Sequence, residues 1–140
     1  MQRHLCFFDG TWNSADDERV LTNVVKLCRA VPDIASDGVR QAVHYVVGIA
    51  TEKSLGELTF AAGAIGYGVP ERILSGYKRL VESYEPGDEI YIFGFSRGAF
   101  QARSLGGLIA QVGVLRPDAV PLIEDAWTCY RSQGSSPDLR

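Results

Sequence analysis

Three runs of mostly apolar residues mark the chain, each next to a turn that contains glycine. They are 4–8 (HLCFF), 39–47 (VRQAVHYVV) and 89–95 (EIYIFGF). None alternates cleanly between apolar and polar positions, which is typical of strands buried on both faces of a parallel sheet. The pattern therefore predicts three parallel strands.

Apolar residues elsewhere recur at three- and four-residue intervals, which predicts four helices. The stripes are Leu21, Val24, Val25, Cys28 and Val31, then Ile73, Tyr77, Leu80, Val81 and Tyr84, then Leu105, Leu108, Ile109 and Val112, with a fourth segment at 119–131. The resulting order, β-α-β-α-β-α-α, predicts an α/β protein with a parallel three-layer α/β/α sheet and helices on both faces.

Composition adds limits on function. The chain has 140 residues, of which 46% are hydrophobic and 22% charged, as expected for one soluble globular domain. A net charge of −3 argues against a nucleic-acid partner, and no apolar run approaches the ~20 residues of a transmembrane segment. The cysteines and histidines share no metal-ligand spacing, so we expect reduced thiols, no metal and no cofactor.

Two segments are set apart by their composition. The glycine-rich connection 48–68 would leave the C-terminal end of the second strand, where ligands bind in open α/β sheets. The last residues, 133–140, read as a loose tail or a truncation point, so we assign the domain to 1–132.

Ser96 lies where the third predicted strand meets the third predicted helix, in the sequence Gly94-Phe95-Ser96-Arg97-Gly98. A nucleophile at such a strand-to-helix turn needs small residues on both sides, which Gly94 and Gly98 supply. The backbone N–H of Arg97 would then face the developing oxyanion. The alternative is a glycine-rich turn that serves only packing or anion binding.

A second oxyanion donor is expected from the turn after the first strand, FFDGTWN, at Gly10 or Thr11. Asp9 would lie at the rim beside Ser96, or it would simply order the turn, as Asp-Gly pairs commonly do. Both interpretations of Asp9 remain open from the sequence.

Arg97 carries a positive charge into the first turn of a helix, which is unfavourable by about 0.3–1 kcal/mol. The side chain should therefore have a compensating partner. That partner would be an acidic side chain of the protein or an anionic group of a substrate, such as a phosphate.

Several segments together resemble a known family. They are FFDGTWN, TNVVKLCRAV, QAVHYVVGIAT, YEPGDEIYIFGFSRGAFQARSLGGLI and VGVL. They are similar, in the same order, to the α/β-hydrolase family that forms the catalytic domain of type VI secretion phospholipase effectors. The resemblance implies an α/β-hydrolase core, with Ser96 as nucleophile of a serine esterase or phospholipase acting on lipid or small esters. One departure is GIAT at 48–51, where the family usually has glycine in third place.

A serine nucleophile needs a general base, and neither histidine of the sequence is well placed to act as one for Ser96. Both histidines, His4 and His44, precede Ser96 and fall at the start and middle of predicted strands, His44 about 10 Å below the edge at ~3.3 Å per residue. We therefore expect the N-terminal part of a larger hydrolase, its acid and base supplied by missing downstream sequence or another chain. The alternative is a catalytically inactive binding or interaction module. The expected location is cytoplasmic, or exported without a signal peptide.

Overall fold

The computed structural model describes residues 1–10, 21–48 and 69–133. Within them, one parallel sheet is formed by β1 (Gln2–Phe8), β2 (Arg40–Val46) and β3 (Glu89–Gly94). The strand order is β2-β1-β3, with β1 in the middle and parallel to both neighbours. The three predicted strands and their parallel arrangement are confirmed.

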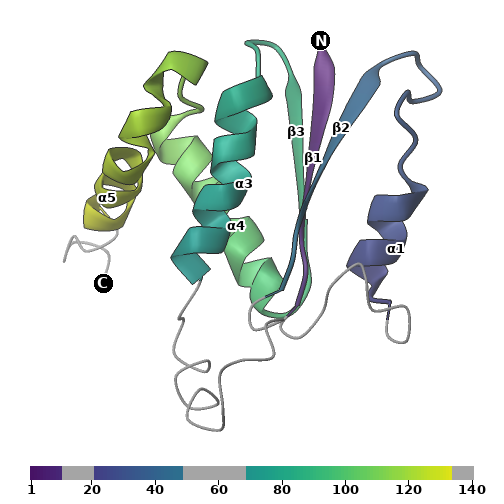
Figure 1. Cartoon of the computed structure of the whole chain (residues 1–140), viewed down its shortest axis with the longest axis horizontal. Coiled ribbons are helices and arrows are strands. Elements are labelled where there is room, and N and C mark those ends of the chain that lie inside the picture. Colours follow the sequence, from purple (N-terminus) through teal and green to yellow (C-terminus); the bar gives the residue numbers. More distant parts are fainter. Residues whose placement is uncertain (11–20, 49–68, 134–140) are drawn as a thin grey trace, which may run out of the picture.

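Helices cover both faces of the sheet (Figure 1). Helix α1 (Asn23–Ala30) lies on one face, and α3 (Val69–Ser83) and α4 (Arg97–Val112) lie on the other, with α5 (Ile123–Gln133) outside them. The three-layer α/β/α architecture is therefore as predicted, and it is consistent with part of an α/β-hydrolase-like fold.

The fourth helix differs in part from the prediction of 119–131. Its first residues belong to a 3₁₀ segment, η2 (Pro117–Leu122), and the α-helix begins only at Ile123. Pro121 explains the difference, because proline has no N–H to donate within an α-helix and its ring clashes with the preceding turn.

The apolar runs are continuous because β1 is buried on both faces. Cys6 and Phe8 point into a core with α3 and α4, whereas Leu5 and Phe7 pack with Val24 of α1. The rings of Phe7 and Phe93 stack with their centroids 4.9 Å apart, so β3 contributes to the α1 side as well.

Helix α3 packs unusually close to the sheet and fixes the end of α4. A Cβ atom on Gly76 would lie 2.6 Å from Cζ of Phe8. The next residue is Tyr77, whose hydroxyl donates to the carbonyl of Gly113 at 2.9 Å and accepts from the N–H of Leu115 at 3.3 Å. Helix α3 therefore joins the sheet to the C-terminal end of α4.

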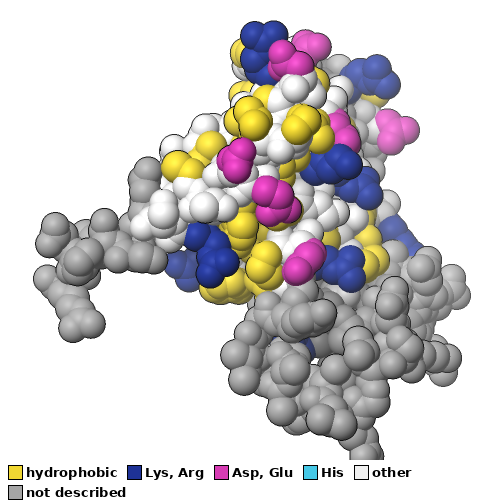
Figure 2. All heavy atoms as spheres, turned by 60° about the vertical axis from the view of Figure 1, so that its left-hand side comes forward, with side chains coloured by type: hydrophobic (Ala, Val, Ile, Leu, Met, Phe, Trp, Pro, Cys, Tyr) yellow, Lys and Arg dark blue, Asp and Glu magenta, His cyan; other side chains and the backbone are white. Residues whose placement is uncertain are grey.

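Charges of both signs are interspersed with apolar side chains on the face shown in Figure 2, without a broad basic field. In the described part of the chain, no helix combines the length and apolar character needed to cross a bilayer. The predicted connection 48–68, apart from Gly48, and the tail beyond Gln133 lie outside the described residues.

Candidate active site

The serine turn and the Asp-Gly turn meet at one edge of the sheet. Phe8 and Gly94 are register partners at the C-terminal ends of β1 and β3, so the residues that follow them leave the sheet side by side. The N–H of Phe95 donates to the carbonyl of Phe8 at 3.1 Å, which extends the pairing by one bond. Asp9 and Ser96 therefore belong to the same edge, as the sequence predicts.

Ser96 has a strained backbone. Its φ of 55° and ψ of −126° make it the one non-glycine residue with positive φ in residues 1–10, 21–48 and 69–133. It occupies the N-cap position of α4 but makes no side-chain capping bond, and it is exposed. Such strain costs about 1–3 kcal/mol and tends to persist at functional sites.

Two glycines allow this backbone, for the reason the sequence suggests. A Cβ atom on Gly94 would come within 2.6 Å of the carbonyl carbon of Gly98. A Cβ atom on Gly98 would come within 2.6 Å of the carbonyl oxygen of Asp9. The start of α4 thus rests directly on the main chain at the end of β1, and neither position has room for a side chain.

Asp9 is almost completely buried, with 1% of its surface exposed, and orders the turn. Its Oδ1 accepts the N–H of Gly10 at 2.7 Å, and its Oδ2 accepts the hydroxyls of Tyr45 at 2.6 Å and Thr22 at 3.0 Å. Of the two interpretations left open by the sequence, this geometry favours the turn-ordering one. Gly10 N–H is directed at Asp9 in this arrangement, and Thr11 lies outside the described residues.

Tyr45 and Thr22 are the partners that the sequence analysis missed. A buried carboxylate at the end of an apolar strand must find hydrogen-bond donors, so the need for such partners could be anticipated. Their identity could not, because Thr22 precedes α1 and Tyr45 lies on β2, and only the folded sheet brings them to Asp9.

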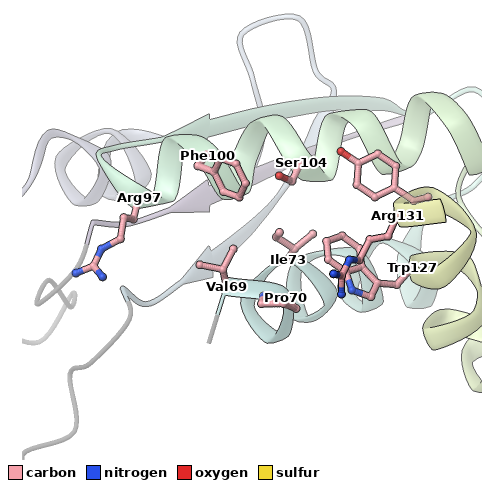
Figure 3. A pocket seen from close by; sticks show the side chains of 9 residues that line it. Val69, Pro70, Ile73, Arg97, Phe100, Ser104, Trp127 and Arg131 are labelled. Atoms are coloured by element: carbon pink, nitrogen blue, oxygen red, sulfur yellow. The ribbon is translucent and has the colours of Figure 1, made fainter. Parts of the chain in front are cut away.

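A pocket of about 480 Å³ opens beside the serine turn, between α3, α4 and α5 (Figure 3). Its walls are mainly apolar, with arginines at both ends. They are Val69, Pro70, Ile73, Arg97, Phe100, Ser104, Trp127, Tyr130 and Arg131. Arg97 lies at the end nearest Ser96, with its side chain directed outward, and Arg131 lies next to Trp127 at the other end. The volume falls in the range of small-molecule sites.

The two histidines lie within the strands, at different depths below this edge. His4 pairs in register with Ile90, four residues before β1 ends, whereas His44 pairs with Cys6, two residues before β2 ends. His4 is fully buried and contacts His44, so both belong to another network. The interpretation that neither serves Ser96 agrees with this register. No cluster of three metal-ligating side chains occurs in the described residues.

The amino-acid sequence also matches a known protein family. The chain matches the family described as "T6SS, Phospholipase effector Tle1-like, catalytic domain" over residues 2–139. It is 33% identical over 138 residues to the protein named "Uncharacterized protein YEL023C" of Saccharomyces cerevisiae, covering 90% of this chain and 20% of that protein. The chain thus spans about a fifth of the length of this curated relative. No solved structure matches it.

Proposed function

Because this chain belongs to the family of the Tle1-like catalytic domain of type VI secretion phospholipase effectors, we propose that it carries the nucleophile of a serine hydrolase acting on lipid esters. The observation that supports the assignment of Ser96 is its backbone, with φ of 55° in an otherwise unstrained turn between β3 and α4. Strain of this kind lifts a serine hydroxyl above the sheet edge in α/β-hydrolases.

The proposed reaction is acyl transfer through Ser96. Its Oγ attacks the acyl carbon of the ester while a base takes the hydroxyl proton, giving a tetrahedral intermediate. Collapse of that intermediate breaks the bond to the alcohol oxygen, which takes a proton and leaves as the free alcohol. Water then attacks the acyl-serine, releasing the carboxylic acid and restoring the hydroxyl.

The oxyanion of the intermediate needs two N–H donors. The first is the N–H of Arg97, the residue after the nucleophile at the start of α4. Gly10 and Thr11 remain the candidates for the second. Gly10 would have to release its 2.7 Å bond to Asp9 Oδ1 before it could donate to substrate, which makes Thr11 the simpler choice.

The pocket between α3, α4 and α5 supports a lipid substrate. Phe100 follows Ser96 by one helical turn, and the apolar walls then continue along α4 toward Trp127. An acyl chain is the ester component that such walls favour. The positive charge of Arg97 at the near end suits an anionic headgroup.

The base and acid would come from outside these 140 residues. His4 and His44 are the only histidines in the sequence, and within the sheet they contact each other, with His4 also 3.0 Å from Asp88. We therefore propose that a histidine and a carboxylate reach Ser96 from elsewhere in the full-length protein or from another chain. On this proposal, the 140 residues alone turn over ester slowly or not at all.

Labelling with a fluorophosphonate probe tests this assignment in the full-length protein. Ser96→Ala should abolish labelling and hydrolysis of a phospholipid vesicle substrate. Ser83→Ala is the matched control, because Ser83 is an exposed serine at the end of α3 and lies outside both the turn and the pocket lining. Labelling that persists in Ser96→Ala would contradict the proposal.

A non-catalytic binding module is the second candidate, favoured by the absence of any histidine near Ser96 in the described structure. It predicts a full-length protein that binds lipid vesicles but shows neither labelling nor hydrolysis. The serine hydrolase predicts both, so the same experiment separates the two functions.

A further inference from the structure

Gln101 and Ser104 are two buried polar residues on neighbouring turns of α4. Gln101 is fully buried and Ser104 is 8% exposed, and their spacing of three positions brings both side chains to one face of the helix. The other buried polar residues in the described part of the chain, His4 and Asp9, both take part in hydrogen bonds. The pair on α4 makes no side-chain hydrogen bond within the described residues.

The amide of Gln101 is the more unusual of the two side chains. Both Oε1 and Nε2 are shielded from solvent, and neither has a hydrogen-bond partner in the chain as described. A buried amide ordinarily has at least one partner, because an unpaired amide loses its hydration without compensation. The exception points to a ligand or a water that supplies the bond.

The neighbours of Gln101 on α4 place it at the inner wall of the pocket between α3, α4 and α5. Arg97 and Ser104 line the pocket (Figure 3), and they lie one turn before and one turn after Gln101. Phe100, the preceding residue, lines it as well. Gln101 itself is not part of the lining, so rotation about its side-chain bonds has to bring the amide to a ligand there.

The surroundings of this pair favour an uncharged polar group. Val69, Ile73 and Phe100 form apolar walls, and the two arginines lie at the ends of the pocket rather than in its middle. The amide offers one acceptor, Oε1, and one donor group, Nε2, and the hydroxyl of Ser104 can do either. A hydroxyl is the smallest uncharged group of a lipid ester that both donates and accepts.

We propose that Gln101 and Ser104 bind a hydroxyl group of an ester lipid in this pocket, and so select hydroxylated esters over plain ones. The ligand hydroxyl donates to Oε1 or accepts from Nε2 of Gln101, and it exchanges a second hydrogen bond with Ser104. The apolar walls cover the rest of the chain.

The position of Gln101 on α4 limits where that hydroxyl lies in the ligand. At ~1.5 Å per residue, Gln101 is about 7.5 Å further along the helix than Ser96, and helical side chains lean back toward the N-terminus. The hydroxyl is therefore a few bonds from the ester, on the acyl chain or on the alcohol. The choice of an ester as ligand rests on the proposed function, whereas the unpaired amide does not.

Urea unfolding of Gln101→Met tests whether the amide serves a ligand rather than the fold. Methionine has a similar length but no amide to satisfy, so the unfolding constant should fall by about tenfold. Gln111→Met is the matched control, because Gln111 is exposed on the same helix, and it should change the constant by no more than about twofold. Lower stability of Gln101→Met, or its failure to fold, would show a structural amide or a buried water only, and would overturn the proposal.

Binding of three short esters to the full chain tests the selectivity. Ethyl decanoate has no hydroxyl, ethyl 3-hydroxydecanoate has one on the acyl chain, and glyceryl monodecanoate has its hydroxyls on the alcohol. With Ser96→Ala to prevent turnover, the Kd from titration calorimetry should be about tenfold lower for one of the hydroxy esters than for ethyl decanoate. Adding Gln101→Met should remove that preference and leave the Kd of ethyl decanoate unchanged.

The hydroxy ester that binds more tightly shows which part of the lipid carries the hydroxyl. Equal affinity for the three esters, no binding of any, or a preference that Gln101→Met retains would refute the proposal. Because calorimetry measures no turnover, such a result would leave the fluorophosphonate labelling of Ser96 unaffected. Conversely, a hydroxyl preference lost in Gln101→Met would stand even if Ser96 were not labelled.

Discussion

The phenol of Tyr45 donates a 2.6 Å hydrogen bond to Oδ2 of Asp9, so the end of β2 holds the turn that follows β1. Tyr45→Phe removes this bond to a buried carboxylate. We expect a loss of about 1.5–3 kcal/mol in the free energy of unfolding, the usual value for hydrogen bonds to charged groups. Urea denaturation at pH 7.5 measures it.

Tyr91→Phe is the matched control, because the Tyr91 hydroxyl also donates to a carboxylate, Glu89, but Tyr91 is 43% exposed. The free energy of unfolding should fall much less in Tyr91→Phe than in Tyr45→Phe. Equal effects would mean that the burial of Asp9 adds nothing to the strength of its bonds.

The contact between α4 and β1 gives a second prediction. Gly98→Ala places a methyl group against the main chain of Phe8 and Asp9, which cannot move without disturbing the sheet. We expect destabilisation of about 1–3 kcal/mol or more, measured by thermal or urea unfolding. Gly106→Ala on the same helix should instead be neutral or stabilising by up to about 1 kcal/mol, since its nearest neighbour is Cδ1 of Ile92 at 4.0 Å.

Strain at Ser96 gives a third prediction. Glycine adopts a φ of 55° without penalty, whereas alanine does not, so Ser96→Gly should unfold at higher urea than Ser96→Ala. The expected difference is about 1 kcal/mol, from relief of 1–3 kcal/mol of strain partly offset by glycine's extra freedom when unfolded. Equal stabilities of the two variants would show that the turn stores no strain.

The cysteines give a fourth prediction. Burial raises the pKa of the Cys6 thiol to about 12, with Arg79 opposing the shift in part, so Cys6 is not a thiolate at pH 8. Cys129 is exposed. A disulfide reagent at pH 8 should therefore modify Cys129 quickly and Cys6 only as fast as the chain unfolds. Rapid modification of Cys6 in the native protein would contradict its placement in the core.

The three layers of the fold could be predicted because each apolar pattern in this sequence fits only one kind of element, either a strand or a helix. Continuous apolar runs such as HLCFF fit a strand covered on both faces, and the stripes from Ile73 to Val81 fit α3 closely. The order of the strands, β2-β1-β3, could not be obtained from these patterns, because it depends on which faces the helices choose.

The serine turn, as a piece of backbone, could be predicted because its residues are close together in the sequence. Gly94, Ser96 and Gly98 act on one another within five residues, so their spacing indicates the turn. The partners of Asp9 and the chain from Asp88 through His4 to His44 could not be inferred, because each joins residues that meet only when separate strands pair. Long-range polar contacts leave no periodic signal in the sequence.

A carboxylate holds each end of β1: Asp88 accepts the N–H of Gln2, and Asp9, the residue after the strand, accepts the hydroxyl of Tyr45 on β2. Among the described residues, its neighbours β2 and β3 each pair with a strand on one side only. Local opening should therefore begin at the outer strands and reach the middle one last, so that the amides of Leu5 to Phe8 report global unfolding while those of Arg40 to Val46 report smaller fluctuations.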